Sequence, residues 1–305
     1  MKALDQKTTQ PPKLVGLSEL LVQAVQAFKS GGRQTLALVG FGIFLPQLLS
    51  TWVLAVPSGR TASGLWKIAL ATKSSPGITA ATLPAMMEEV SRFFGPFLVT
   101  SILCLFVFGV SYACLVYLSL HHFRPWAFPR LAAKELIGDM ARLVLRRGIL
   151  LGGLVLSMGF ATQAFALTSL FLAALSLMAP VLMIAEHKSA LRSLTQSITL
   201  RYARQVPMGG WSAFLSLVTL GGLFFSLQFG LDWFSGMTLN WLGTHMPPGI
   251  SAQVPGLPFT YGYAVIDAMQ ALASSLLIAV LPGATAALYL QVHFRNSKRD
   301  LSIRA

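Results

Sequence analysis

The chain has 305 residues, of which 54% are apolar and 11% are charged. A soluble domain carries about 25% charged residues, so this composition excludes an ordinary water-soluble protein, and the high apolar content also excludes intrinsic disorder. The net charge of +13, from 23 Lys and Arg against 10 Asp and Glu, is compatible with nucleic acid, an anionic membrane surface or an acidic protein as the partner.

Membrane spans are predicted from stretches without Asp, Glu, Lys or Arg, because about 20 apolar residues cross the ~30 Å hydrocarbon core of a bilayer. The longest stretch, Gly148 to Ala185, would reach about 57 Å as one helix. A polar break at 161–163 therefore predicts two short spans joined by a tight turn. The sequence thus predicts an all-α polytopic membrane protein with six transmembrane helices in three hairpins, at about residues 35–56, 94–118, 149–165, 167–185, 207–230 and 268–291.

These spans define the expected organisation of the chain. Residues 1–13 form a polar arm, residues 14–294 a single membrane domain and residues 295–305 a basic tail. The polar arm lacks an apolar signal core followed by a cleavage site, so the first span is expected to act as an uncleaved anchor. Long outer loops are expected at 60–92 and at 232–267.

The basic residues predict the orientation of the spans. On one side of the membrane, the arm, the connections and the tail together hold 19 of the 23 Lys and Arg. The positive-inside rule places that side in the cytoplasm, with both termini inside. Once the acidic residues are assigned in the same way, the inner side carries the whole +13 and the outer side is neutral.

Each predicted hairpin follows a basic segment with helical periodicity, at 17–33, 131–147 and 189–204. The apolar face expected for the third consists of Leu191, Leu194, Ile198 and Tyr202. These segments are expected to be cytoplasmic amphipathic helices in the membrane interface, with the apolar face toward acyl chains or neighbouring spans. The alternative is a set of solvated loops that only satisfy the positive-inside rule. The interfacial interpretation identifies six candidate contacts for lipid headgroups: Arg142, Arg146, Arg147, Arg192, Arg201 and Arg204.

One motif carries a resemblance to known membrane proteins. The motif consists of a proline in the fourth predicted span, an acidic residue just after that span and a basic helix that contains a serine. Its residues are Pro180, Glu186, Leu194, Ser197 and Leu200. The pattern resembles the YciC-like and glycerophosphodiester phosphodiesterase membrane-domain-like families of six-span bacterial proteins. The resemblance implies an integral inner-membrane protein and a structural role for the motif. Glu186 is expected to pair with Arg192 or with a basic residue of the connection after the second span, rather than to recognise a cationic ligand.

The sequence offers no catalytic constellation. It contains no phosphate-binding glycine loop, paired-cysteine motif or zinc-binding HExxH motif. The adjacent His121 and His122 point about 100° apart on a helix, which favours an interfacial cap over a site for a metal or a lipid headgroup. We therefore expect no enzyme activity, no metal and no cofactor.

The sixth predicted span carries a stripe of small residues. Ala271, Ser275, Ala279, Gly283 and Ala287 recur every four residues, which lets another helix approach closely. Pro282 lies within the same span and would kink it. Intramolecular helix packing is the favoured interpretation, and a hinge or a substrate passage is the alternative.

Two functions lead on the sequence, and a membrane enzyme, which would need two acids and a His converging in one cleft, ranks third. The first is a non-enzymatic protein of envelope maintenance that engages anionic lipids or a membrane-protein partner. The second is a transporter or export accessory for a lipid or amphipathic solute. Binding of nucleic acid is not expected, because the basic residues are distributed among connections next to the membrane.

Overall fold

The computed structural model describes residues 17–54, 83–147, 174–199, 209–245, 253–254 and 260–303. These residues are helical apart from short connections and one isolated bridge between Gln253 and Thr260, which confirms the all-α prediction for this part of the chain. The helices are α1 (Leu17–Ser30), α2 (Gly32–Val39), the π-helix η1 (Gly40–Phe44), α4 (Leu83–Phe123), α5 (Ala133–Arg147), α8 (Ala179–Ala185), α9 (Ala190–Ile198), α10 (Gly209–His245) and α11 (Tyr261–Ile303).

Four helices are long and apolar enough to cross a membrane, so the chain is a multi-pass membrane protein by length and composition. They cover Gly32–Leu54, Met86–Phe123, Phe214–Thr238 and Tyr261–Val292, and overlap the first, second, fifth and sixth predicted spans. The predicted span at 149–165 lies outside the described residues. Of the span at 167–185, the structure describes only the short apolar helix Ala174–Ala185. The arrangement of six spans in three hairpins therefore stays a prediction.

The first span contains a π-helix just before a proline. At the end of η1, the backbone N–H of Leu45 donates to the carbonyl of Gly40, five residues earlier. Pro46 follows and has no N–H to donate, so the regular α-helical bonding pattern cannot continue through this position. Helical geometry then resumes through residue 54.

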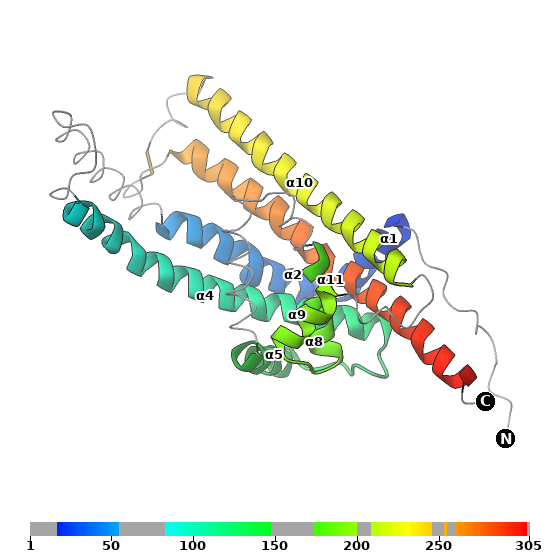
Figure 1. The fold of residues 1–305 in the computed structure, drawn as a ribbon. Coiled ribbons are helices and arrows are strands. Elements are labelled where there is room, and N and C mark those ends of the chain that lie inside the picture. Colours follow the sequence, from blue (N-terminus) through cyan, green and yellow to red (C-terminus); the bar gives the residue numbers. More distant parts are fainter. Residues whose placement is uncertain are drawn as a thin grey trace. The chain divides into compact units, whose positions relative to one another are not determined.

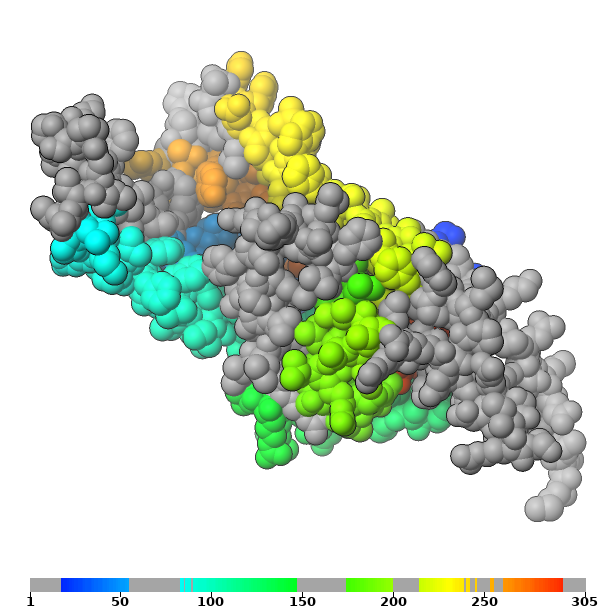
Figure 2. Space-filling model, in the orientation of Figure 1, coloured from blue at the N-terminus to red at the C-terminus, as the bar shows by residue number. Residues whose placement is uncertain are grey.

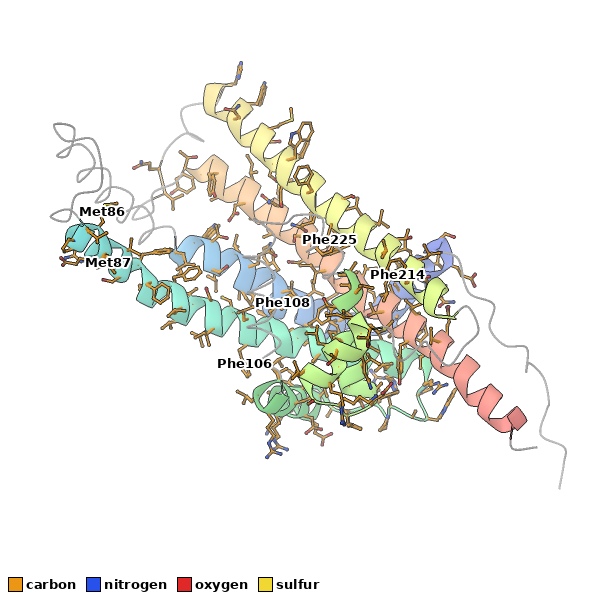
Figure 3. The ribbon with its side chains drawn as sticks, in the orientation of Figure 1. Met86, Met87, Phe106, Phe108, Phe214 and Phe225 are labelled. Atoms are coloured by element: carbon orange, nitrogen blue, oxygen red, sulfur yellow. The ribbon has the colours of Figure 1, made fainter. Side chains whose placement is uncertain are left out.

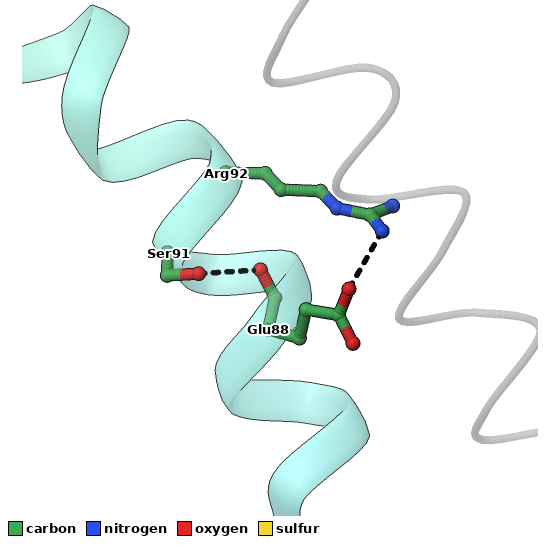
Figure 4. Close-up of polar contacts among 3 residues, drawn as sticks. All are labelled: Glu88, Ser91 and Arg92. Atoms are coloured by element: carbon green, nitrogen blue, oxygen red, sulfur yellow. Dashed lines mark hydrogen bonds and ion pairs between the residues drawn. The ribbon is translucent and has the colours of Figure 1, made fainter.

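The long helices extend beyond the predicted spans, and several residues expected in outer loops belong to helices. Helix α4 begins at Leu83, inside the expected loop at 60–92. Figure 4 shows how charged residues are accommodated there, with Arg92 paired to Glu88 at 2.7 Å and the Ser91 hydroxyl donating to the Glu88 carbonyl at 2.8 Å. An opposite charge four residues away supports a helix. A search for uncharged stretches therefore begins the helix too late.

The same extension occurs in α10 and α11. Helix α10 continues to His245 and α11 begins at Tyr261, so Asp232 and Asp267 lie within helices and not at the ends of a loop from 232 to 267. Helix α11 also continues to Ile303, through the predicted basic tail. Both aspartates fall inside candidate membrane spans. The prediction did not place them there, because it searched only for stretches without charged residues.

The chain divides into two compact units. Unit 1 contains Met1–Leu38, Val110–Gln228 and Leu276–Ala305, and unit 2 contains Val39–Gly109 and Phe229–Ser275. The core of unit 1 includes Ala24 of α1, Leu220 of α10, and Leu281 and Ala284 of α11. In the same unit α8 and α9 lie side by side (Figure 1), and residues 174–199 reach the surface of the molecule (Figure 2).

Unit 2 leaves many apolar side chains uncovered. Val99, Ile102 and Leu103 of α4 are all about 60% exposed, and Met87 projects from the first turns of the same helix (Figure 3). A soluble protein would bury side chains of this kind, because their contact with water is unfavourable. In a membrane span they contact acyl chains.

Candidate functional site

The helix α5 has three distinct sides. Leu136, Met140 and Val144 form a buried row at four-residue intervals. Ile137 and Leu145 each follow a residue of this row by one position, about 100° further around the helix, and remain 45% and 54% exposed. A helix on the surface of a soluble protein needs a buried side and a polar side, so the exposed apolar side of α5 is an additional feature.

The third side of α5 is charged. Arg142 and Arg146 follow Met140 and Val144 by two positions, about 200° around the helix, and both are exposed. Arg142 pairs weakly with Asp139, at 3.7 Å, on the same exposed side. Arg147 ends the helix. Two of the predicted headgroup residues therefore project away from the buried row, on the side opposite to it.

The helix α9 repeats this order. Ala190 is buried, Leu191 is 60% exposed and Arg192 is exposed, in three successive positions. The buried face also contains Leu194 and Ser197. Of the apolar face predicted for this segment, Leu194 is buried whereas Leu191 points away from the core, and two serines share the buried side. Arg201 and Arg204, with Tyr202, lie outside the described residues.

The helix α1 also has a buried row and an exposed apolar side. Leu20, Ala24 and Ala27 are buried, whereas Val22 and Val25 are exposed. Ala24 of this row packs with residues of α10 and α11 in the core of unit 1. The three predicted segments are thus helices that each pack one side against other residues and leave further apolar residues uncovered.

The residues of the family-like motif connect α8, α9 and α11. Pro180 lies in the first turn of α8, and Glu186 ends that helix. Glu186 forms an ion pair with Lys188 and accepts a hydrogen bond from the Tyr289 hydroxyl of α11 at 3.2 Å. Lys188 also donates to the Gln196 side chain of α9 at 2.7 Å. The expected partner Arg192 is instead exposed, and the ion pair is with Lys188.

The connection after α4 also contributes a residue near Tyr289. Arg124 lies close enough to Tyr289 for an electrostatic interaction, and burial lowers the pKa of its guanidinium group. Tyr289 therefore interacts with both Glu186 and Arg124, and Arg124 belongs to the connection that was expected to supply a partner for Glu186. The serine of the motif is also buried, and the Ser197 hydroxyl donates to the backbone carbonyl of Leu175. Leu200 lies outside the described residues.

The five small residues of α11 are all buried. In unit 1, Gly283 lies directly against the backbone of α1, and a Cβ atom at this position would be 2.8 Å from the Cα atom of Ala24. In unit 2, the Ser275 hydroxyl donates to the Ala271 carbonyl at 2.6 Å and approaches the Gln47 side chain at 3.5 Å. Small residues let helices approach closely, and at Gly283 the stripe does so. The helix in contact at Gly283 is α1, which precedes the first span.

Unit 2 contains two polar pairs within candidate spans. The Trp52 indole N–H donates to Asp267 at 2.9 Å, and the Gln270 amide donates to Asp232 at 2.6 Å. The sequence prediction had placed both aspartates at the ends of the outer loop at 232–267. The spacing of Asp267 and Gln270, three residues apart on one helix face, was the available signal.

Among the described residues, no group of three or more His, Cys, Asp and Glu side chains converges as a metal site. No family model matches the chain, and no curated protein or solved structure is significantly similar to it.

Proposed function

We propose that this chain is a non-enzymatic bacterial inner-membrane protein, with both termini in the cytoplasm, that engages anionic lipids through the basic side of its short helices and serves envelope maintenance. In the alternative version of the proposal, the same basic surface binds a membrane-protein partner. Membership of the YciC-like group is part of it and rests on the motif around Glu186. Cysteine accessibility at residues 2, 127 and 248 in intact cells tests the orientation, with protection expected at the first two positions and labelling at the third.

The single observation that carries the proposal is the three-sided arrangement of α5. Leu136 and its row pack inward, Ile137 and Leu145 leave apolar surface uncovered, and Arg142 and Arg146 project on a third side. A helix lying in the membrane interface meets three environments, namely protein, acyl chains and phosphate groups, and α5 offers a side for each.

The experiment is a lipid-preference measurement on the detergent-purified full chain. Arg142, Arg146 and Arg147 are replaced by Glu together, and binding to mixed micelles with phosphatidylglycerol is compared with binding to micelles with phosphatidylcholine. A basic residue near an anionic surface contributes about 1 kcal/mol, so the triple reversal should lower the preference for phosphatidylglycerol by roughly 100-fold.

Matched single variants locate the effect. Arg146→Glu and Arg92→Glu make the same change at an exposed arginine of a helix, but Arg92 lies near the predicted outer end of its span. Arg146→Glu should reduce the preference for anionic lipid, and Arg92→Glu should leave it unchanged. Equal effects of the two variants, or an unchanged preference in the triple variant, would contradict the proposal.

The polar pairs of unit 2 favour a second candidate function, the transporter or export accessory. Ionisable residues within membrane spans commonly mark substrate or ion pathways, and Asp267 and Asp232 are hydrogen-bonded within candidate spans. In vesicles that contain the full chain and fluorescent phosphatidylglycerol, transport would appear as faster access of dithionite to inner-leaflet lipid. Loss of this acceleration in Asp267→Asn would support the transporter, and rates equal to those of protein-free vesicles would exclude lipid transport.

A further inference from the structure

We propose that a pocket of unit 1 binds the phosphate group of an anionic lipid headgroup. This inference rests on the proposed engagement of anionic lipid and assigns one specific site for it. The pocket lies between the junction of α1 and α2, the last turns of α4 and the connection that follows α4. It is lined by Ser30, Gly31, Gln34, Leu118, His121, His122, Pro125 and Arg130.

Gly31 lines the pocket, and Gly32 follows it at the start of α2. Gly32 has a φ of +53°, in the left-handed region that favours glycine. At Gly31, a Cβ atom would lie 1.8 Å from the Thr35 hydroxyl oxygen, so a larger residue cannot occupy this position without a shift. The glycine pair therefore sets the turn between α1 and α2, which brings Ser30 and Gln34 to the same pocket.

The opposite wall is fixed by hydrogen bonds. The Tyr117 hydroxyl donates to the Pro129 carbonyl at 2.9 Å, and Nδ1 of His121 donates to the Phe128 carbonyl at 2.6 Å. The rings of Tyr117 and Phe128 also meet edge to face, with centroids 5.9 Å apart. These contacts hold the connection against the end of α4 and thereby place Arg130 at the pocket.

The chemistry of the lining favours an anion. The pocket residues include one arginine and two histidines, but no Asp or Glu. An arginine offers a planar fork of donors that matches the oxygen atoms of a phosphate. Because Nδ1 of His121 carries the proton that it donates to the Phe128 carbonyl, Nε2 of the neutral ring is an acceptor, so the donors for a phosphate come from other residues of the lining. The Gln34 amide supplies a further donor.

The place of the pocket along the chain favours a lipid as the source of the phosphate. The first candidate span begins at Gly32, and the second ends at Phe123. The pocket is lined by residues on either side of both limits, where the hydrocarbon ends and the headgroups begin. Leu118 lies within the second span and offers an apolar contact next to the polar groups.

The test measures retention of lipid by the full chain in detergent, with phosphatidylglycerol as the probe and native mass spectrometry as the readout. Arg130→Gln removes the charge at the pocket, Arg130→Lys keeps it without the fork, and Arg192→Gln removes a charge from an exposed arginine outside the pocket. Arg130 is itself exposed, so these variants should fold, and their melting temperatures check this. A hydrogen bond to a charged group contributes about 1.5–3 kcal/mol, which predicts at least tenfold weaker retention in Arg130→Gln.

The outcomes separate this site from the proposed function. A large loss in Arg130→Gln, a partial loss in Arg130→Lys and a much smaller loss in Arg192→Gln, which removes a charge only from the general basic surface, would support the pocket. Equal losses in Arg130→Gln and Arg192→Gln would overturn it while leaving a general basic surface for lipid. Inorganic phosphate is the second probe, and its displacement of the lipid at millimolar concentration would assign the pocket to free phosphate and overturn the lipid assignment.

Discussion

The contact between Gly283 and α1 gives a sharp prediction for the substitution Gly283→Ala. The added Cβ atom would lie 2.8 Å from the Ala24 Cα atom and 2.9 Å from the Ala24 carbonyl oxygen. The first distance is about 0.6 Å below the 3.4 Å at which ordinary contact begins. Both partners are backbone atoms, so no side chain can rotate away, and α1 and α11 must separate at a point where Ala24 is fully buried.

The magnitude follows from two opposing effects. Alanine is better than glycine in a helix by about 1 kcal/mol, whereas overpacking of a core costs typically 1–3 kcal/mol. Gly222 of α10 is the matched control, because it lies in a helix and its Cβ atom would meet nothing within 4 Å. Gly222→Ala should therefore be neutral or stabilising, and Gly283→Ala should be about 1–3 kcal/mol less stable than Gly222→Ala.

The assay is unfolding of the detergent-purified full chain by titration with SDS, followed by circular dichroism. The quantity compared is the difference in the free energy of unfolding between the two variants. If Gly283→Ala stabilises the protein as much as Gly222→Ala does, the close contact between α1 and α11 is refuted.

Three further predictions use the same unfolding assay. Leu136→Ala should destabilise the protein by about 2–5 kcal/mol, because Leu136 lies on the buried side of α5. Ile137→Ala, one position along, should change the stability little. Similar effects of the two variants would show that α5 does not pack through the Leu136 row. Tyr289→Phe removes the hydrogen bond to Glu186 and should cost about 1 kcal/mol. This cost should disappear in the Glu186→Ala background, where no side-chain acceptor is left, if the two groups interact. Trp52→Phe removes the donor to Asp267 and should cost about 0.5–1.5 kcal/mol, since interhelical hydrogen bonds in membranes are of this size; a neutral result would argue against this pair.

The sequence by itself determined the class of the protein. Apolar stretches longer than the ~20 residues of a span located the four helices that are long enough to cross a membrane. Three segments with helical periodicity were also placed correctly as helices, because backbone hydrogen bonds and side-chain spacing act locally. The small residues of α11, including Gly283, stood out because a four-residue repeat is visible without a partner.

Only the tertiary structure decided where helices end and which residues meet. The rule of uncharged stretches began α4 too late and ended α10 too early, since Glu88 and Asp232 find partners in Arg92 and Gln270. The partner of Gly283 is Ala24, 259 positions away in the chain, and no local pattern indicates such a contact. The pocket at Arg130 arises in the same way, because residues from α1, α2, α4 and a connection converge only after the chain has folded.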